Sequence, residues 1–132
     1  MTDAARSISF FDYPAVFERF ADEFHTALDD VGRRGAFIQQ RDLAEFEEQI
    51  AEYCGVSHCV GVSNATDGLQ LAMMAGGLRP GAEVIISSHT MVATAASIHF
   101  AGGVAVPVGV GADHLIDPEA VRAAVSSSTQ AI

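Results

Sequence analysis

Short apolar runs alternate with helix-like segments along residues 58–132, and this alternation constrains the fold more than any other feature of the sequence. The run Val84-Ile85-Ile86 is continuous, which is typical of a strand buried on both faces of a parallel sheet. Strands that alternate with helices form βαβ units. We therefore predict an α/β fold on a parallel sheet, with right-handed crossovers and with helices on both faces.

The expected elements of this part follow from the apolar runs and from the Gly and Pro residues between them. Strands are predicted at 58–62, 83–87, 104–110 and 129–132. Helices are predicted from the 63–67 junction through Ala75, over 90–101, and from 117 to about 125. Pro107 has no N–H group to offer a neighbouring strand, so we expect its strand away from a fully hydrogen-bonded central position.

An amphipathic helix is predicted over 14–31, because apolar residues recur there at helical spacing. Asp12 is expected to cap this helix, with Pro14 in its first turn. Either Gly32 or Gly35 is expected to end it.

A second amphipathic helix is predicted over 42–54, where Leu43, Phe46, Ile50 and Tyr53 share one face. Asp42 and Glu45 have the spacing of a capping box, with Asp in place of Ser or Thr. Gly55 is expected to end the helix.

The charge of the chain argues against one class of partner. The formal net charge is −10, and nucleic-acid affinity depends on basic residues that neutralise phosphates. No apolar run is long enough to span a bilayer, and residues 1–9 carry Asp3 and Arg6 without the apolar core of a signal peptide. We therefore expect a soluble cytoplasmic protein that binds neither nucleic acid nor membrane.

Cysteine and lysine contents limit the chemistry. Cys54 and Cys59 are too few for a disulfide framework or a metal site, and we interpret both as packing residues in a reducing compartment. The chain contains no lysine, since all seven basic residues are arginines. A mechanism that needs a Schiff-base lysine cannot be completed by these residues alone. The sequence also stops where a new strand would begin, so we expect it to be a fragment of a longer chain.

The strand-to-helix junction at 62–68 is the first candidate site. A helix N-terminus presents unpaired N–H groups and a partial positive charge, and phosphates bind there. Ala65 is small enough for a ligand to approach the backbone, and Thr66 adds a hydroxyl. The alternative is an ordinary helix start capped by Ser63 or Asn64. The junction has neither the GxGxxG nor the Walker pattern, so it does not predict a dinucleotide or nucleoside-triphosphate site.

The junction at 87–91 is the second candidate. His89 is a candidate base or ligand contact, or alternatively a surface or capping residue. The soft thioether of Met91 favours contact with a flat ring, although a core position explains it equally well. The four other histidines have no companions at metal-ligand spacing, so no metal site is predicted. They are His25, His58, His99 and His114.

Several ordered blocks of the sequence resemble the DegT/DnrJ/EryC1/StrS family of sugar aminotransferases, over roughly residues 12–132. The blocks are Arg34-Gly35-Ala36-Phe37-Ile38, Leu43-Ala44-Glu45-Phe46-Glu47, Tyr53-Cys54-Gly55-Val56, Gly61 to Leu69, Arg79 to Ile85, His89 to Thr94, Ile116 to Glu119 and Thr129 to Ile132. Their order and spacing make the resemblance far more specific than any single motif.

The resemblance implies the fold and the activity. It implies the aspartate-aminotransferase type (fold type I) of pyridoxal 5'-phosphate (PLP) enzyme, with residues 1–13 as an N-terminal arm. Residues 14–132 would then form the N-terminal part of the PLP-binding large domain, incomplete at its C-terminus. Members transfer an amino group, usually from glutamate, to a keto group of a nucleotide-linked sugar, at sites on a homodimer interface.

The resemblance also implies roles for four residues. The backbone N–H groups of Ala65 and Thr66 would hold the cofactor phosphate, and Met91 would lie against the pyridine ring. Phe37, near the entrance loop, would line the sugar pocket. No catalytic residue falls in this segment, because the family's lysine and the acid that pairs with the pyridine nitrogen both lie downstream.

The sequence departs from the family pattern at several of these positions. Ala65 replaces the usual Gly, Met91 replaces the usual aromatic residue, and Gly109 and Gly111 stand where acidic residues are common. These changes indicate a divergent branch, in which the sugar and the aminated carbon stay open.

Two other functions are consistent with the missing lysine. The first is a PLP-dependent sugar dehydratase, in which another residue replaces the lysine. The second is a stand-alone, non-catalytic binding or partner-docking module derived from the same fold.

Overall fold

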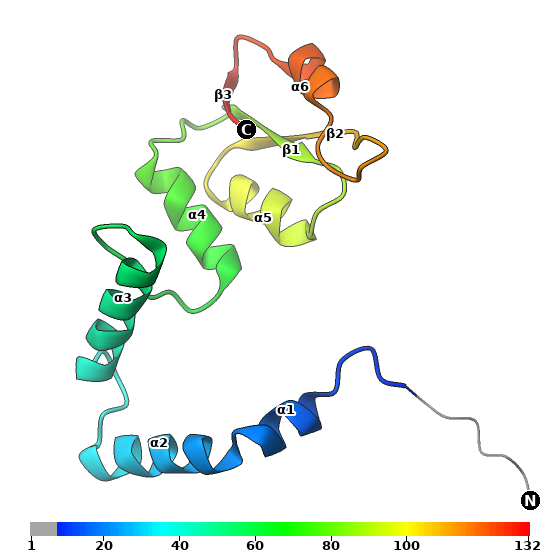
Figure 1. Cartoon of the computed structure of the whole chain (residues 1–132). Helices are drawn as coiled ribbons and strands as arrows, with labels where there is room; N and C mark the ends of the chain where they lie inside the picture. The colour runs from blue at the N-terminus through cyan, green and yellow to red at the C-terminus, as the bar shows by residue number, and fades with distance from the viewer. Residues whose placement is uncertain (1–7) are drawn as a thin grey trace, which may run out of the picture. The chain divides into compact units, whose positions relative to one another are not determined.

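The computed structural model describes residues 8–132, which fall into two compact units, residues 8–60 and 61–132. The described part of the first unit is helical, and the second unit is a small sheet with helices around it (Figure 1). Part of the expected N-terminal arm, residues 1–7, lies outside the described residues. Within residues 8–132, no helix is both long and apolar enough to cross a bilayer.

The helix predicted over 14–31 is two helices, α1 (Tyr13–Arg19) and α2 (Ala21–Arg34). Asp12 caps α1 as predicted, because its side chain accepts a hydrogen bond from the N–H of Ala15 at 3.2 Å. The break falls at Phe20, whose backbone (φ −122°, ψ 16°) leaves the helical region and whose N–H binds the carbonyl of Phe17. Neither Gly nor Pro marks the break, so the residue pattern does not reveal it.

Glycine ends both long helices of the first unit. Gly35 ends α2 with φ 62°, and Gly55 ends α3 (Arg41–Cys54) with φ 67°. This left-handed region is open to glycine at little steric cost. Both ends were predicted, and the structure selects Gly35 over Gly32.

The capping box predicted at the start of α3 is wrong. The N-cap residue is Gln40, which makes no side-chain cap bond. Asp42 instead binds Arg34, and Glu45 pairs with Arg41 at 3.0 Å. Charge-assisted bonds to a guanidinium are stronger than a bond to a neutral backbone N–H, so the carboxylates face the arginines.

The apolar faces of the first unit are largely exposed. Neither α1 nor α2 has a buried residue, and Ala51 is the buried residue of α3. The helices are amphipathic as predicted, and stacked rings mark their apolar side, with Phe17 and Phe24 centred 5.9 Å apart. Cys54 is exposed, so the packing role predicted for it is wrong, whereas Cys59 is half-buried. Both cysteines are free thiols.

The second unit confirms the predicted parallel α/β architecture. Its three strands pair in the order β2-β1-β3, and both pairings are parallel. Helices α4 and α5 pack on each other on one side of the sheet, and α6 lies on the other side (Figure 1). The elements are α4 (Ala65–Ala75), β1 (Glu83–Ser87), α5 (Val92–Phe100), β2 (Val104–Val108), α6 (Pro118–Ala124) and β3 (Thr129–Ala131).

Two strand predictions need correction. Residues 58–62 form no strand, because no described strand lies beside them to accept their backbone hydrogen bonds. The strand predicted over 104–110 ends at Val108, and Val110 makes an isolated antiparallel bridge with Ile116. Pro107 lies in β2, an edge strand of the described sheet, as its missing N–H led us to expect.

The core of the second unit lies between β1 and α5. Ile85 of β1 and Ile98 of α5 are the most buried apolar side chains, with exposed fractions of 1% and 0%. Ser97 is also fully buried, and its hydroxyl donates to the carbonyl of Thr94 at 2.9 Å. Burial of this apolar surface holds α5 on the sheet.

Gly103 packs against this core at the entry to β2. A Cβ atom at Gly103 would lie 2.8 Å from Leu78 Cδ2, and 3.1 Å from both Ile98 Cγ2 and the carbonyl oxygen of Ala82. The carbonyl oxygen of Ala82 is a backbone atom, so it cannot rotate away from an added Cβ atom. Position 103 therefore requires glycine, because any side chain there would clash with these atoms.

We predict that Gly103→Ala lowers the free energy of unfolding by about 1–3 kcal/mol, because the added methyl group overpacks the core. Urea denaturation followed by circular dichroism measures the loss. Gly109→Ala is the matched control, since no atom lies within 4 Å of its added Cβ. Equal unfolding midpoints for the two variants would contradict the packing argument.

Candidate functional site

The start of α4 leaves two backbone N–H groups without a partner. Asn64 is the N-cap residue, with an extended backbone (φ −163°, ψ 169°), and its carbonyl accepts the first helical bond from the N–H of Gly68 at 3.1 Å. Its side-chain oxygen accepts from the N–H of Asp67 at 3.0 Å. Within residues 8–132, the N–H groups of Ala65 and Thr66 therefore have no acceptor.

A ring of side-chain contacts fixes this helix start. The carboxylate of Asp67 accepts from the Ser63 hydroxyl and, at 2.9 Å, from the side-chain amide of Asn64. That amide also lies 3.1 Å from the Ser63 hydroxyl oxygen. The two residues predicted as alternative caps thus act together, with Asn64 as the cap and Ser63 as a support for Asp67.

The helix start has the chemistry of an oxyanion site. Unpaired N–H groups and the helix dipole contribute positive potential, which the negative charge of Asp67 on the same turn opposes. Ala65 is exposed and Thr66 is half-buried. The Thr66 hydroxyl makes no hydrogen bond within the described residues, so it is a third donor on the same turn. Among residues 8–132, no group of three His, Cys, Asp or Glu side chains could hold a metal ion.

Met91 is the N-cap residue of α5, and its side chain is exposed. Its backbone is extended (φ −66°, ψ 142°), and its carbonyl accepts from the N–H of Thr94 at 3.0 Å. The exposed fraction of Met91 is 76%, so its side chain is not part of the core that residues 8–132 form. The side chain is therefore open to contact with a ligand, beside a helix that packs on α4.

His89 lies on the same loop, two residues before Met91. Its backbone N–H binds the Ser87 hydroxyl at 3.2 Å, and its side chain is exposed. The loop itself is anchored to the sheet, since the N–H of Ser88 binds the carbonyl of Val108 at 2.8 Å. These contacts describe a loop residue at the edge of the sheet and assign the His89 ring no partner.

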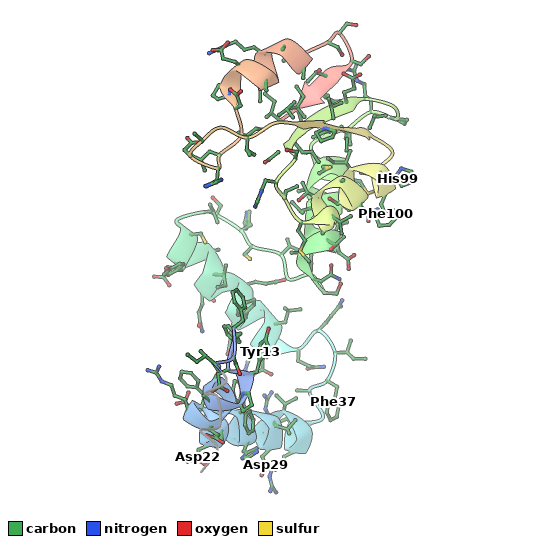
Figure 2. The ribbon with its side chains drawn as sticks, turned by 90° about the vertical axis from the view of Figure 1, so that its right-hand side faces the viewer. Tyr13, Asp22, Asp29, Phe37, His99 and Phe100 are labelled. Carbon is green, nitrogen blue, oxygen red and sulfur yellow. The ribbon has the colours of Figure 1, made fainter. Side chains whose placement is uncertain are left out.

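Phe37 lies in the first unit, whereas Ala65, Thr66 and Met91 lie in the second. Figure 2 shows Phe37 on the loop between α2 and α3, and its exposed fraction is 72%. Three of the four predicted residues thus belong to one compact unit. The fourth, Phe37, is an exposed aromatic side chain of the other unit.

A pair of contacts that the sequence analysis missed flanks the Phe37 loop. Arg34 Nη2 lies 2.8 Å from Asp30 Oδ2 and 2.9 Å from Asp42 Oδ2. Hydrogen bonds to Asp30, and then to Asp42, raise the pKa of Arg34. The hydrogen bond from Arg34 lowers the pKa of the Asp42 carboxyl, although loss of hydration opposes this shift. The spacing of Asp30 and Arg34 signals an ion pair along α2, but no local pattern signals the bond to Asp42.

Comparison with known proteins places this geometry in a family. Residues 18–132 match the profile of the DegT/DnrJ/EryC1/StrS aminotransferase family. A dTDP-3-amino-3,4,6-trideoxy-alpha-D-glucose transaminase of Streptomyces venezuelae is 36% identical over 126 residues, which cover 95% of this chain and 33% of the relative. A UDP-2-acetamido-2-deoxy-3-oxo-D-glucuronate aminotransferase of Pseudomonas aeruginosa is 35% identical over 128 residues, which cover 95% and 35%. The chain spans about a third of the length of these relatives.

Solved structures confirm the predicted fold. DesV of S. venezuelae, in complex with a ketimine intermediate, matches with a TM-score of 0.88 at 35% identity, over 93% of this chain and 33% of that chain. NtdA of Bacillus subtilis, with bound cofactor PMP (pyridoxamine 5'-phosphate), matches with a TM-score of 0.83 at 26% identity, over 96% and 30%. The described residues therefore have the fold of part of an aminotransferase.

We predict that the Asp42 carboxyl titrates below its ordinary pKa of 3.8 and returns toward that value in Arg34→Gln. Because the folded-state pKa is the lower one, the ion pair stabilises the folded chain above the unfolded pKa. This contribution is lost as the pH falls through the folded pKa. NMR titration of the side-chain carboxyl carbons measures the midpoint.

The control for this titration is Arg33→Gln, because Arg33 pairs with Asp29 on α2 itself. The Asp42 midpoint should not move in this variant. If both substitutions moved it equally, the shift would come from net charge rather than from the Arg34 contact.

Proposed function

Because the chain belongs to the DegT/DnrJ/EryC1/StrS aminotransferase family, we propose that it forms the cofactor-phosphate-binding part of a PLP-dependent sugar aminotransferase. The reaction would move an amino group, from glutamate, onto a keto group of a nucleotide-linked sugar. The observation that carries the proposal is that the N–H groups of Ala65 and Thr66 have no acceptor among the described residues 8–132. Bound PLP supplies the electron sink that this amino-group chemistry requires.

Ala65 and Thr66 would bind the cofactor phosphate. Their two N–H groups and the Thr66 hydroxyl are donors on one helical turn, and the dipole of α4 adds positive potential. Ala65 keeps the approach open, since its side chain is a single methyl group. Asp67 places a negative charge nearby, but its carboxylate is engaged by Ser63 and Asn64.

Met91 would cover one face of the cofactor ring. Its thioether is exposed at the start of α5, and sulfur makes favourable contacts with aromatic rings. A methionine in this place excludes water from the ring as an aromatic residue would, with a weaker preference for one stacking geometry. The consequence is a more adaptable ring wall.

Further parts of the proposal rest on the family resemblance. Phe37 would line the sugar pocket, residues 1–13 would form an arm, and residues 14–132 would form the N-terminal part of the large domain. The active site would be completed at a homodimer interface in the cytoplasm. The relatives named above are transaminases of dTDP-linked and UDP-linked sugars, which supports a nucleotide-linked sugar as the substrate class.

The Schiff-base lysine would come from outside residues 1–132, because this sequence contains none. The segment would then contribute phosphate donors and one ring wall, while proton transfer would belong to the part that carries the lysine. A PLP-dependent sugar dehydratase, with another residue in place of the lysine, would use the same phosphate contacts.

We predict that PMP shifts the backbone amide signals of Ala65 and Thr66 in the NMR spectrum of the 132-residue chain. PMP carries the cofactor phosphate and an amine, so it needs no lysine to bind. Thr66→Val should weaken PMP binding about fivefold, as expected for the loss of a hydrogen bond worth roughly 1 kcal/mol. The titration of amide shifts measures both the site and the affinity.

Two controls make this experiment specific for the phosphate. Thr66→Ser keeps the hydroxyl and should bind PMP close to the wild-type affinity. Pyridoxamine has the ring without the phosphate and should leave the Ala65 and Thr66 signals in place. If PMP moved other amides and left these two unchanged, the assigned phosphate contacts would be wrong.

We predict that borohydride reduction in the presence of PLP attaches one pyridoxyl phosphate to the polypeptide that carries residues 1–132. Peptide mapping by mass spectrometry should place it on a lysine outside these residues. Bound PLP without an adduct, together with dehydration of a nucleotide-linked sugar, would favour the dehydratase. Absence of both adduct and PLP binding would favour the non-catalytic module.

A further inference from the structure

One guanidinium group joins the two long helices of the first unit. Arg34, the last residue of α2, binds Asp30 through Nε and Nη2, at 2.9 Å and 2.8 Å. The same Nη2 donates to both carboxylate oxygens of Asp42, in the first turn of α3, at 2.9 Å and 3.1 Å. The planar guanidinium therefore spans the loop 35–40 from one end to the other.

The backbone of this loop has a defined shape. Gly35 and Gln39 have positive φ values of 62° and 43°, and the N–H of Ala36 binds the carbonyl of Val31 at 3.0 Å. At the other end, the N–H of Leu43 binds the carbonyl of Gln40 at 3.0 Å. The loop is thus a compact turn whose two ends are fixed by hydrogen bonds.

The turn presents two apolar side chains to solvent. Phe37 and Ile38 are exposed to 72% and 76%, between Arg34 on one side and Asp42 on the other. Polar contacts at the ends and apolar residues at the tip are the arrangement of a recognition loop held in one conformation. Within the described residues, burial of these two side chains contributes little to the stability of the turn, because both are exposed.

Stability does not explain the Arg34 contacts either. Arg34 and its two partners, Asp30 and Asp42, are charged groups near the surface, and exposed ion pairs contribute little to the stability of the fold. A fork shared between two carboxylates does contribute geometric definition, because each N–H fixes a direction. The neighbouring Arg33 shows the contrast, since among residues 8–132 its ion pair is with Asp29, on the same helix.

We propose that Arg34 is a positioning residue, which fixes the turn between α2 and α3 so that Phe37 and Ile38 meet the nucleotide-linked sugar. This inference rests on the proposed function for its substrate. Arg34 would touch neither sugar nor cofactor, and it would act through the conformation of residues 35–40.

The test compares Arg34→Gln with Arg33→Gln in the polypeptide that carries this segment, with a dTDP-linked or UDP-linked keto sugar as acceptor. Both variants remove one positive charge from the end of α2. Arg34→Gln should raise the KM for the sugar about tenfold with kcat nearly unchanged, since misplaced binding groups act through geometry. Arg33→Gln should leave both constants at their wild-type values. PMP affinity should be the same in all three proteins.

Two further variants separate geometry from charge. Arg34→Lys keeps the charge and loses the planar fork, so it should recover only part of the wild-type KM. Asp42→Asn removes one end of the connection and should resemble Arg34→Gln. If Arg34→Gln had the same KM as Arg33→Gln, the inference would be overturned. It would also be overturned if Arg34→Gln lost PMP affinity as strongly as sugar affinity, because that loss would indicate general structural damage.

The positioning inference can fail separately from the proposed function. NMR relaxation in the 132-residue chain measures the backbone order of residues 35–40 without any activity. Arg34→Gln should lower that order and Arg33→Gln should not. Equal order in the two variants overturns the inference whether or not the longer polypeptide is a transaminase. Absence of transaminase activity with wild-type PMP binding would instead overturn the proposed function and, with it, the substrate assigned to the loop.

Discussion

The pairing of β1 with both of its neighbours is the interaction on which the second unit depends. β1 is the central strand of the described sheet, and Ile85 on it is almost fully buried. Ile98 brings α5 onto this strand, and the loop after Ser87 is anchored to β2 through Ser88. The position of Met91 at the start of α5 follows from this packing. The position of Met91 is therefore determined by packing in the core and not by the residues of its own loop.

The sequence pattern correctly predicted those elements that depend on residues close together along the chain. The continuous apolar run of β1, the Asp12 cap and the glycines that end α2 and α3 all act within a few residues, and all were predicted. Residues 58–62 have the composition of a strand, but a strand exists only beside a partner, and the described residues provide none. The break at Phe20 coincides with neither Gly nor Pro, and the contact of Asp42 with Arg34 joins residues eight positions apart across a turn. Local spacing predicts neither feature.

The features of the candidate site also divide into those that the sequence predicted and those that only the structure could decide. A cap at Ser63 or Asn64 was readable as a helix start, and the geometry then decided that Asn64 caps while Ser63 binds Asp67. The exposure of Met91 could not be predicted, because a methionine before an apolar helix suits a core as well as a surface. The assignment of Ala65 and Thr66 to a phosphate came from the family resemblance and stays a prediction. Within residues 8–132 their two N–H groups have no acceptor, which is the feature that such a role requires.

Charge at the start of α4 bears on how the proposed phosphate would be neutralised. A phosphate group at Ala65 and Thr66 would meet neutral donors, and Asp67 on the same turn carries a negative charge. The described part of the second unit has two arginines: Arg79, which precedes β1 and binds Gln130, and Arg122, which pairs with Glu119. Both guanidinium groups thus have partners of their own within the second unit. Helix dipoles contribute only part of the neutralisation that a doubly charged group needs. At the proposed cofactor site, any further neutralisation of the phosphate would then have to come from groups outside these residues, as the lysine would.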